Sequence, residues 1–191
     1  MLNVMDRLAR TMAIVGGLVL SALIVLTCVS VLGRGLNTLG HSGILPEALG
    51  AALIAAGVGP VTGDFELVEA GIAFAIFSFL PICQLYSGHA TVDIFTQALP
   101  KRGNRWLIAF WEVVLTLVIW LITWRLFAGL QNKLDYGETT FLLQFPVWWA
   151  YAASFIAALV ASLVALYCAW ARLAEAATGR RHMPYTQGAA H

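Results

Sequence analysis

Four stretches of this chain are long and apolar enough to cross a lipid bilayer as α-helices. A bilayer core about 30 Å thick needs about 20 apolar helical residues. The chain is 60% hydrophobic and 11% charged, whereas a soluble domain has about 45–50% apolar and about 25% charged residues. We therefore predict an all-α membrane protein, a four-transmembrane-helix bundle over residues 1–175. Its spans are residues 11–33, 64–87, 106–129 and 145–171.

The first apolar run is longer than the core of a cleaved signal peptide, which has about 7–15 residues. We therefore interpret residues 11–33 as a signal anchor that is retained.

The basic residues are sorted between the two sides of the predicted bundle. With four spans, the N-terminus, the 88–105 loop and the C-terminal tail share one side. Loops on the cytoplasmic side carry the excess of Lys and Arg, so we predict that both termini are cytoplasmic. The richer side has Arg7, Arg10, Lys101, Arg102, Arg105, Arg172, Arg180 and Arg181, and the other side has Arg34, Arg125 and Lys133.

Two segments fall outside the four spans. The apolar stretch within residues 44–60 is too short to cross the bilayer, and a fifth span there would invert the charge pattern. We expect it to be interfacial or re-entrant. Residues 176–191 form the predicted cytoplasmic tail, whose end lacks any apolar periodicity and is expected to be disordered.

Three polar residues near or within the spans need an explanation. His89 and Asp93 lie four residues apart after the second span, where an amphipathic helical extension would place them on one face. Such a pair is typical of a structural or headgroup contact, because a metal site would need a third ligand. Glu112 lies inside the third apolar run. We expect either pairing with Arg105, seven residues earlier, or a role toward a partner subunit or an ion.

The segment 136–151 leads into the fourth span. Pro146 suits the first turn of a helix. Trp148 and Trp149 are typical of an aromatic belt at the membrane interface. Belt anchoring leaves the preceding stretch, which includes Gly137, Glu138 and Thr140, unexplained.

Small residues recur every fourth position along the fourth span. This spacing lets helix backbones approach closely, so we predict a packing face there. The row is Ala153, Ala157, Ala161 and Ala165.

Several classes of function are not supported by the sequence. We find no nucleophile–base set, phosphate loop or cofactor fingerprint, and we expect no catalytic residue, no cofactor and no metal site. A net charge of +1 argues against a nucleic-acid partner. Broken helices or inverted repeats, which are typical of a transporter that acts alone, are not visible.

Three stretches together resemble the DctQ-like family, the small permease subunits of tripartite ATP-independent periplasmic (TRAP) transporters. They are GDFELVEAGIAF, GHATVDIFTQALP and GETTFLLQFPVWWAY, in this order, and the resemblance covers residues 5–175. It implies a multi-pass protein of the bacterial inner membrane that works with a large permease subunit and a periplasmic solute-binding protein. It further implies that a cation gradient drives the uptake of organic acids, and that this chain braces the large subunit and helps to dock the binding protein.

The resemblance also assigns structural or interface roles to particular residues. They are Glu69, His89, Asp93, Gly137, Glu138, Thr140, Pro146, Trp148 and Trp149.

Two alternative functions are a membrane anchor of a respiratory enzyme complex and a free-standing small channel. The anchor would need haem-ligating histidines within the spans, and the channel would need polar residues along them.

Overall fold

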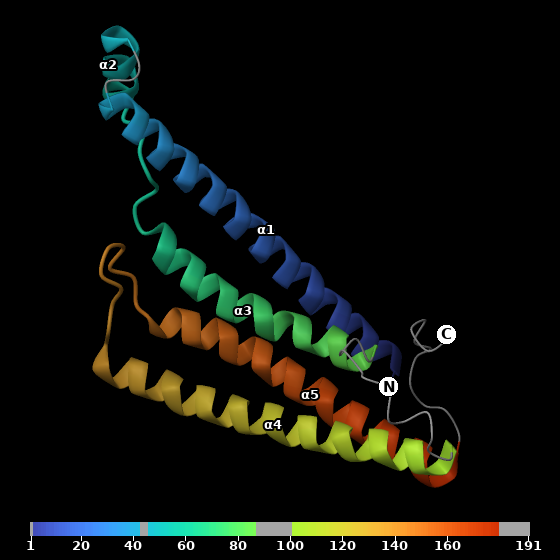
Figure 1. Cartoon of the computed structure of the whole chain (residues 1–191). Coiled ribbons are helices and arrows are strands. Elements are labelled where there is room, and N and C mark those ends of the chain that lie inside the picture. Colours follow the sequence, from blue (N-terminus) through green and yellow to red (C-terminus); the bar gives the residue numbers. More distant parts are fainter. Residues whose placement is uncertain (1, 43–45, 87–100, 180–191) are drawn as a thin grey trace.

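The computed structural model describes residues 2–42, 46–86 and 101–179 (Figure 1), and within these ranges it contains helices and no named strand. The five helices are α1 (Leu2–His41), α2 (Glu47–Ala55), α3 (Asp64–Leu85), α4 (Lys101–Tyr136) and α5 (Trp148–Thr178). Four of them, all but α2, are long and apolar enough to cross a membrane. The fold class predicted from the sequence, an all-α protein with four transmembrane helices, is confirmed.

The four long helices lie side by side in the order α4, α5, α3, α1 (Figure 1). The main contacts are those of α4 with α5, of α5 with α3 and of α3 with α1. Where the helices are closest, Ala9 of α1 and Leu85 of α3 form a buried cluster with Val164 and Cys168 of α5. Toward its other end α1 diverges from α5 (Figure 1).

Three of the long helices extend beyond the predicted spans. Helix α1 has 40 residues, which corresponds to about 60 Å at 1.5 Å per residue, twice the thickness of the hydrocarbon core. Hydropathy marks only the apolar part of a helix, whereas the hydrogen-bonded backbone continues until a residue interrupts it. Helix α5, for example, ends at Gly179, whose φ of 74° is readily adopted by glycine. Its last turn thus extends to Thr178, beyond residue 176, where we expected the tail to begin.

The segment predicted as interfacial or re-entrant contains helix α2, which packs against the end of α1. A Cβ atom on Gly50 would lie 2.9 Å from the carbonyl oxygen of Gly40, so the two backbones are in close contact. The side-chain amide of Asn37 donates a hydrogen bond to the carbonyl of Val58 over 2.8 Å. Figure 1 shows α2 beyond the start of α3. Its position relative to the bilayer stays a prediction.

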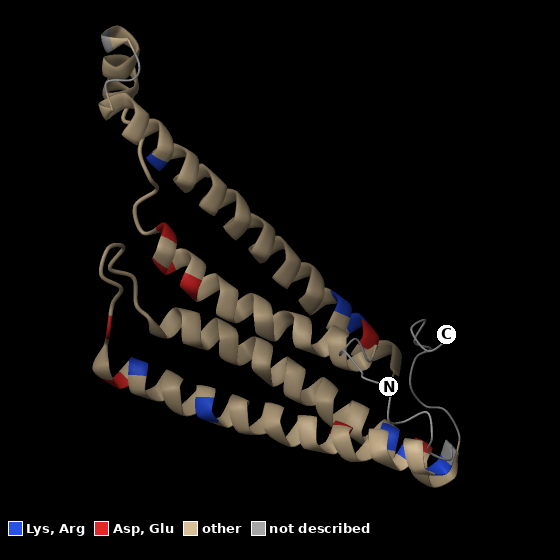
Figure 2. Cartoon of the chain, viewed as in Figure 1, with Lys and Arg blue, Asp and Glu red and all other residues tan. Residues whose placement is uncertain are grey.

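Most charged residues lie toward the two ends of the helices (Figure 2). Arg10 at the start of α1 donates a hydrogen bond of 2.6 Å to the Tyr86 hydroxyl at the end of α3. We call this end, with Arg7, Arg10, Arg102, Arg105 and Arg172, the basic end. The opposite end, with Asp64, Glu66, Glu69, Asp135 and Glu138, is the acidic end.

Candidate functional site

The small residues of α5 lie in its contacts with the neighbouring helices. Ala157, Ala161 and Ala165 are fully buried, while Ala153 is partly buried. Ala161 and Ala165 pack with Ile119 of α4. Because no larger side chains lie between them, α4 and α5 can approach each other closely, as expected for small residues at this spacing.

Hydroxyl groups of α4 connect the two backbones along the same contact. The Thr116 hydroxyl lies 3.2 Å from the backbone carbonyl oxygen of Ala165, and the Thr123 hydroxyl lies 2.8 Å from the side-chain hydroxyl of Ser162. Both threonines also donate to carbonyls one turn earlier in α4, Thr116 to that of Glu112. Ala161, Ala165 and the hydroxyl groups therefore form one packing surface between α4 and α5.

Glu112 has a different partner from the one that we considered in the sequence. It is 8% exposed, and the side-chain amide of Gln84 in α3 donates to its Oε1 over 2.9 Å. Arg105 lies farther toward the basic end, where it lines a small hollow with Arg172 and Glu175. The hydrogen bond of Glu112 thus joins α3 to α4, whose backbones do not approach each other in the described part of the chain.

The loop between α4 and α5 is a tight hairpin. Gly137 begins it with a φ of 61°, a left-handed conformation that glycine readily adopts. Glu138 forms an ion pair with Lys133, and its carbonyl accepts a hydrogen bond of 3.0 Å from the amide of Val147. A single β-bridge joins Thr139 to Pro146. The positive φ of Gly137 and the ion pair of Glu138 give these two residues structural roles, which aromatic anchoring had left unexplained.

Glu66 of α3 holds the tip of this hairpin. Its carboxylate accepts hydrogen bonds from the backbone amides of Leu142 and Leu143, over 2.6 and 3.0 Å. This role of Glu66 is not apparent from the sequence. A contact that spans more than 70 residues gives no signal in local spacing.

The aromatic residues after Pro146 begin α5 at the acidic end. Trp149 is 57% exposed and Trp148 is partly buried. Their rings meet edge to face with centroids 6.1 Å apart. An exposed tryptophan at a helix end is consistent with anchoring at the membrane interface.

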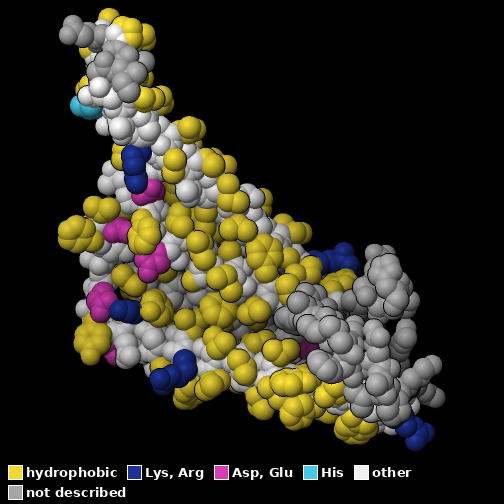
Figure 3. Space-filling model, in the orientation of Figure 1, with side chains coloured by type: hydrophobic (Ala, Val, Ile, Leu, Met, Phe, Trp, Pro, Cys, Tyr) yellow, Lys and Arg dark blue, Asp and Glu magenta, His cyan; other side chains and the backbone are white. Residues whose placement is uncertain are grey.

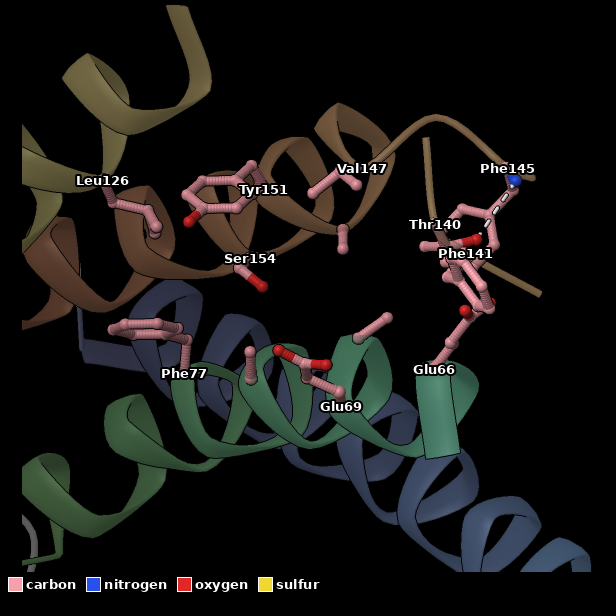
Figure 4. A pocket seen from close by; sticks show the side chains of 13 residues that line it. Glu66, Glu69, Phe77, Leu126, Thr140, Phe141, Phe145, Val147, Tyr151 and Ser154 are labelled. Atoms are coloured by element: carbon pink, nitrogen blue, oxygen red, sulfur yellow. Dashed lines mark hydrogen bonds between the residues drawn. The ribbon is translucent and has the colours of Figure 1, made fainter. Parts of the chain in front are cut away.

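A cavity of about 460 Å³ lies below the hairpin, between α3, α4 and α5 (Figure 4). Glu66, Glu69 and Thr140 lie toward the hairpin, and Phe77 and Leu126 lie at the far end. Ser154 is 2% exposed, and its hydroxyl has no hydrogen-bond partner among the described residues. The complete lining is Glu66, Glu69, Ala70, Ala73, Phe77, Leu126, Thr140, Phe141, Phe145, Val147, Ala150, Tyr151 and Ser154.

The structure thus brings Glu69 and Thr140 to one cavity and keeps Glu112 apart, nearer the basic end. His89 and Asp93 lie outside the described residues. Within the described ranges, no group of three or more His, Cys, Asp or Glu residues could hold a metal ion.

Comparison with known families matches residues 23–176 to the family described as "Tripartite ATP-independent periplasmic transporters, DctQ component". No curated protein and no solved structure matches the chain. Members of this family are components of transporters rather than enzymes, and they reside in the inner membrane, which argues against a respiratory enzyme anchor. With more than half of its length matched and with four helices that can span a membrane, the chain belongs to the DctQ family and is a small membrane subunit of a TRAP transporter.

Proposed function

We propose that this chain braces the large permease subunit of a cation-driven TRAP transporter for organic acids, and that its acidic end helps to dock the periplasmic binding protein. The cation and the solute would be bound by the partner proteins. The chain itself would supply a static surface for the large subunit within the membrane, and a small surface for the binding protein outside the membrane.

The open arrangement of the helices is the observation that carries this proposal. In an apolar stretch of 18 residues within α1, only 6% of the residues are buried by the rest of the chain, whereas 50% are buried in the corresponding stretch of α5. Figure 3 shows hydrophobic side chains across the face turned to the viewer, between the charged groups of the two ends. A protein that leaves most of its membrane helices uncovered offers a broad surface to a second membrane protein.

The acidic end has the features of a docking surface. Phe141, at the tip of the hairpin, is 89% exposed, and Phe65, in the first turn of α3, is 73% exposed. Exposed aromatic side chains surrounded by polar groups are typical of protein interfaces. Glu66 fixes the hairpin that presents Phe141, so this surface is preorganised, which lowers the entropic cost of binding.

Reconstitution in liposomes tests the accessory role. Alone, this chain should take up no organic acid under a cation gradient. Uptake should require the large subunit and the binding protein as well, because the chain lacks a solute site of its own. Uptake measured with this chain alone would contradict the proposal, and uptake by the two partners without this chain would contradict the bracing role.

The proposed docking requires the acidic end to face the periplasm. Reporter enzymes that are active only in the periplasm should be active when fused after Asp64 or Asp135, and inactive when fused after Arg102 or Arg181. The asymmetry of eight basic residues against three predicts this orientation. An active fusion after Arg102 would mean that the four-span topology with cytoplasmic termini is wrong.

A further inference from the structure

We propose that the cavity below the hairpin binds the headgroup of a phospholipid with a primary amine, such as phosphatidylethanolamine. A volume of about 460 Å³ falls within the range of small-molecule sites, about 300–1,000 Å³. It is therefore large enough for a headgroup and the first part of its acyl chains.

The polar groups of the cavity favour a cationic donor. Neither Lys nor Arg lines it, whereas two carboxylates do. Glu66 is already occupied by the backbone amides of the hairpin. Glu69 is exposed and lines the cavity, and no hydrogen bond or ion pair joins it to another described residue. An ionised carboxylate only accepts hydrogen bonds, so a ligand of Glu69 must have N–H or O–H groups. A positively charged donor would bind more strongly, because charge-assisted hydrogen bonds are stronger than neutral ones.

Ser154 is a second, independent sign of a ligand. Its hydroxyl is buried without a partner, which is costly, because buried polar groups are almost always hydrogen-bonded. Figure 4 shows this hydroxyl directed into the cavity, facing the part of α3 that carries Glu69. A ligand amine between the two helices would donate to both oxygens.

The rest of the lining changes from polar to apolar along the helices. Glu66 and Glu69 belong to the first two turns of α3, and Tyr151 and Ser154 to the first two turns of α5. Phe77 and Leu126 close the cavity deeper in the membrane domain (Figure 4). Exposed Trp149 marks the depth of the lipid headgroups at the same helix ends. Such a gradient matches an amphiphile whose headgroup lies at the interface and whose chains point into the membrane.

The chemistry of the site discriminates among headgroups. The ammonium of phosphatidylethanolamine has N–H donors for Glu69 and Ser154. The quaternary ammonium of phosphatidylcholine has none, and phosphatidylglycerol carries no cation. We therefore expect phosphatidylethanolamine to bind most tightly, phosphatidylcholine less tightly and phosphatidylglycerol least tightly.

Native mass spectrometry tests the proposal with the full-length chain, alone and in complex with the large subunit. The protein is equilibrated with vesicles that contain equal parts of the three phospholipids, and the lipids retained per protein are counted. The wild-type protein should retain phosphatidylethanolamine preferentially. Glu69→Gln should reduce this retention about tenfold or more, the loss expected for one charge-assisted hydrogen bond. Ala73→Leu, which fills part of the cavity, should also reduce it, and Ser154→Ala should do so to a smaller extent.

Asp135→Asn is the matched control, because Asp135 is an exposed acid of the acidic end that does not line the cavity. It should retain the lipid like the wild type. All variants should remain monodisperse and co-purify with the large subunit, which separates loss of lipid from loss of folding. Equal retention of the three lipids by the wild type, or retention unchanged in both Glu69→Gln and Ala73→Leu, would overturn the proposal. So would the displacement of the lipid by a side chain of the large subunit in the complex.

Discussion

The Ala161→Leu substitution is expected to destabilise the membrane domain strongly. Ala161 is fully buried and packs with Ile119 of α4, and Leu80 of α3 lies against the same cluster. Three added carbon atoms cannot be accommodated there unless the helices move apart. Overpacking of this kind costs about 1–3 kcal/mol.

Separation of α4 from α5 would also break the polar contacts of Thr116 and Thr123 with α5. In a membrane this loss is not offset by the burial of more apolar surface, because lipid chains are as apolar as leucine. Thermal unfolding in detergent and the yield of the complex with the large subunit measure the effect. Both should fall for Ala161→Leu and change little for Leu163→Phe, since Leu163 is 55% exposed. Equal behaviour of the two variants would show that α4 and α5 are not tightly packed at this point.

The number of long helices and their chemistry could be predicted from the sequence, because the requirement to cross a bilayer acts on each helix separately. Hydropathy and length are local properties, and they identified α1, α3, α4 and α5. The ends of α1 and α4 could not be derived in this way, because their polar flanking turns, such as those around Arg102 and Tyr136, remain helical outside the apolar part.

The neighbours of each helix could not be predicted, because lateral order depends on contacts between residues far apart in the chain. Arg105 was the visible candidate for Glu112, since a spacing of seven on one helix is apparent in the sequence. Gln84, the actual partner, lies on α3. The hydrogen bond between Glu66 and the hairpin likewise joins residues that are far apart in the sequence. The cavity with Glu69 and Ser154 exists only because α3 and α5 are adjacent.

The second large effect is expected at the buried pair of Gln84 and Glu112. Gln84→Leu removes the amide that donates to Glu112 Oε1, and the carboxyl group remains 8% exposed between the helices. A buried polar group that loses its partner costs about 1–3 kcal/mol. Leucine at this position is itself compatible with the membrane, so the cost arises from Glu112 and not from the new side chain.

This reasoning predicts that a second substitution should restore stability. When Glu112→Leu is combined with Gln84→Leu, no unpaired carboxyl group remains, and replacing both partners of a buried hydrogen bond by apolar groups is nearly neutral. The double variant should therefore be more stable than Gln84→Leu alone in thermal unfolding. The coupling energy of the cycle should lie near about 0.6 kcal/mol and not exceed about 1.7 kcal/mol, the mean and the maximum measured for hydrogen bonds between membrane helices. Strictly additive losses would mean that the two side chains do not interact. If the double variant were stable and assembled with the large subunit but the complex lost transport, Glu112 would act in the complex beyond its bond to Gln84.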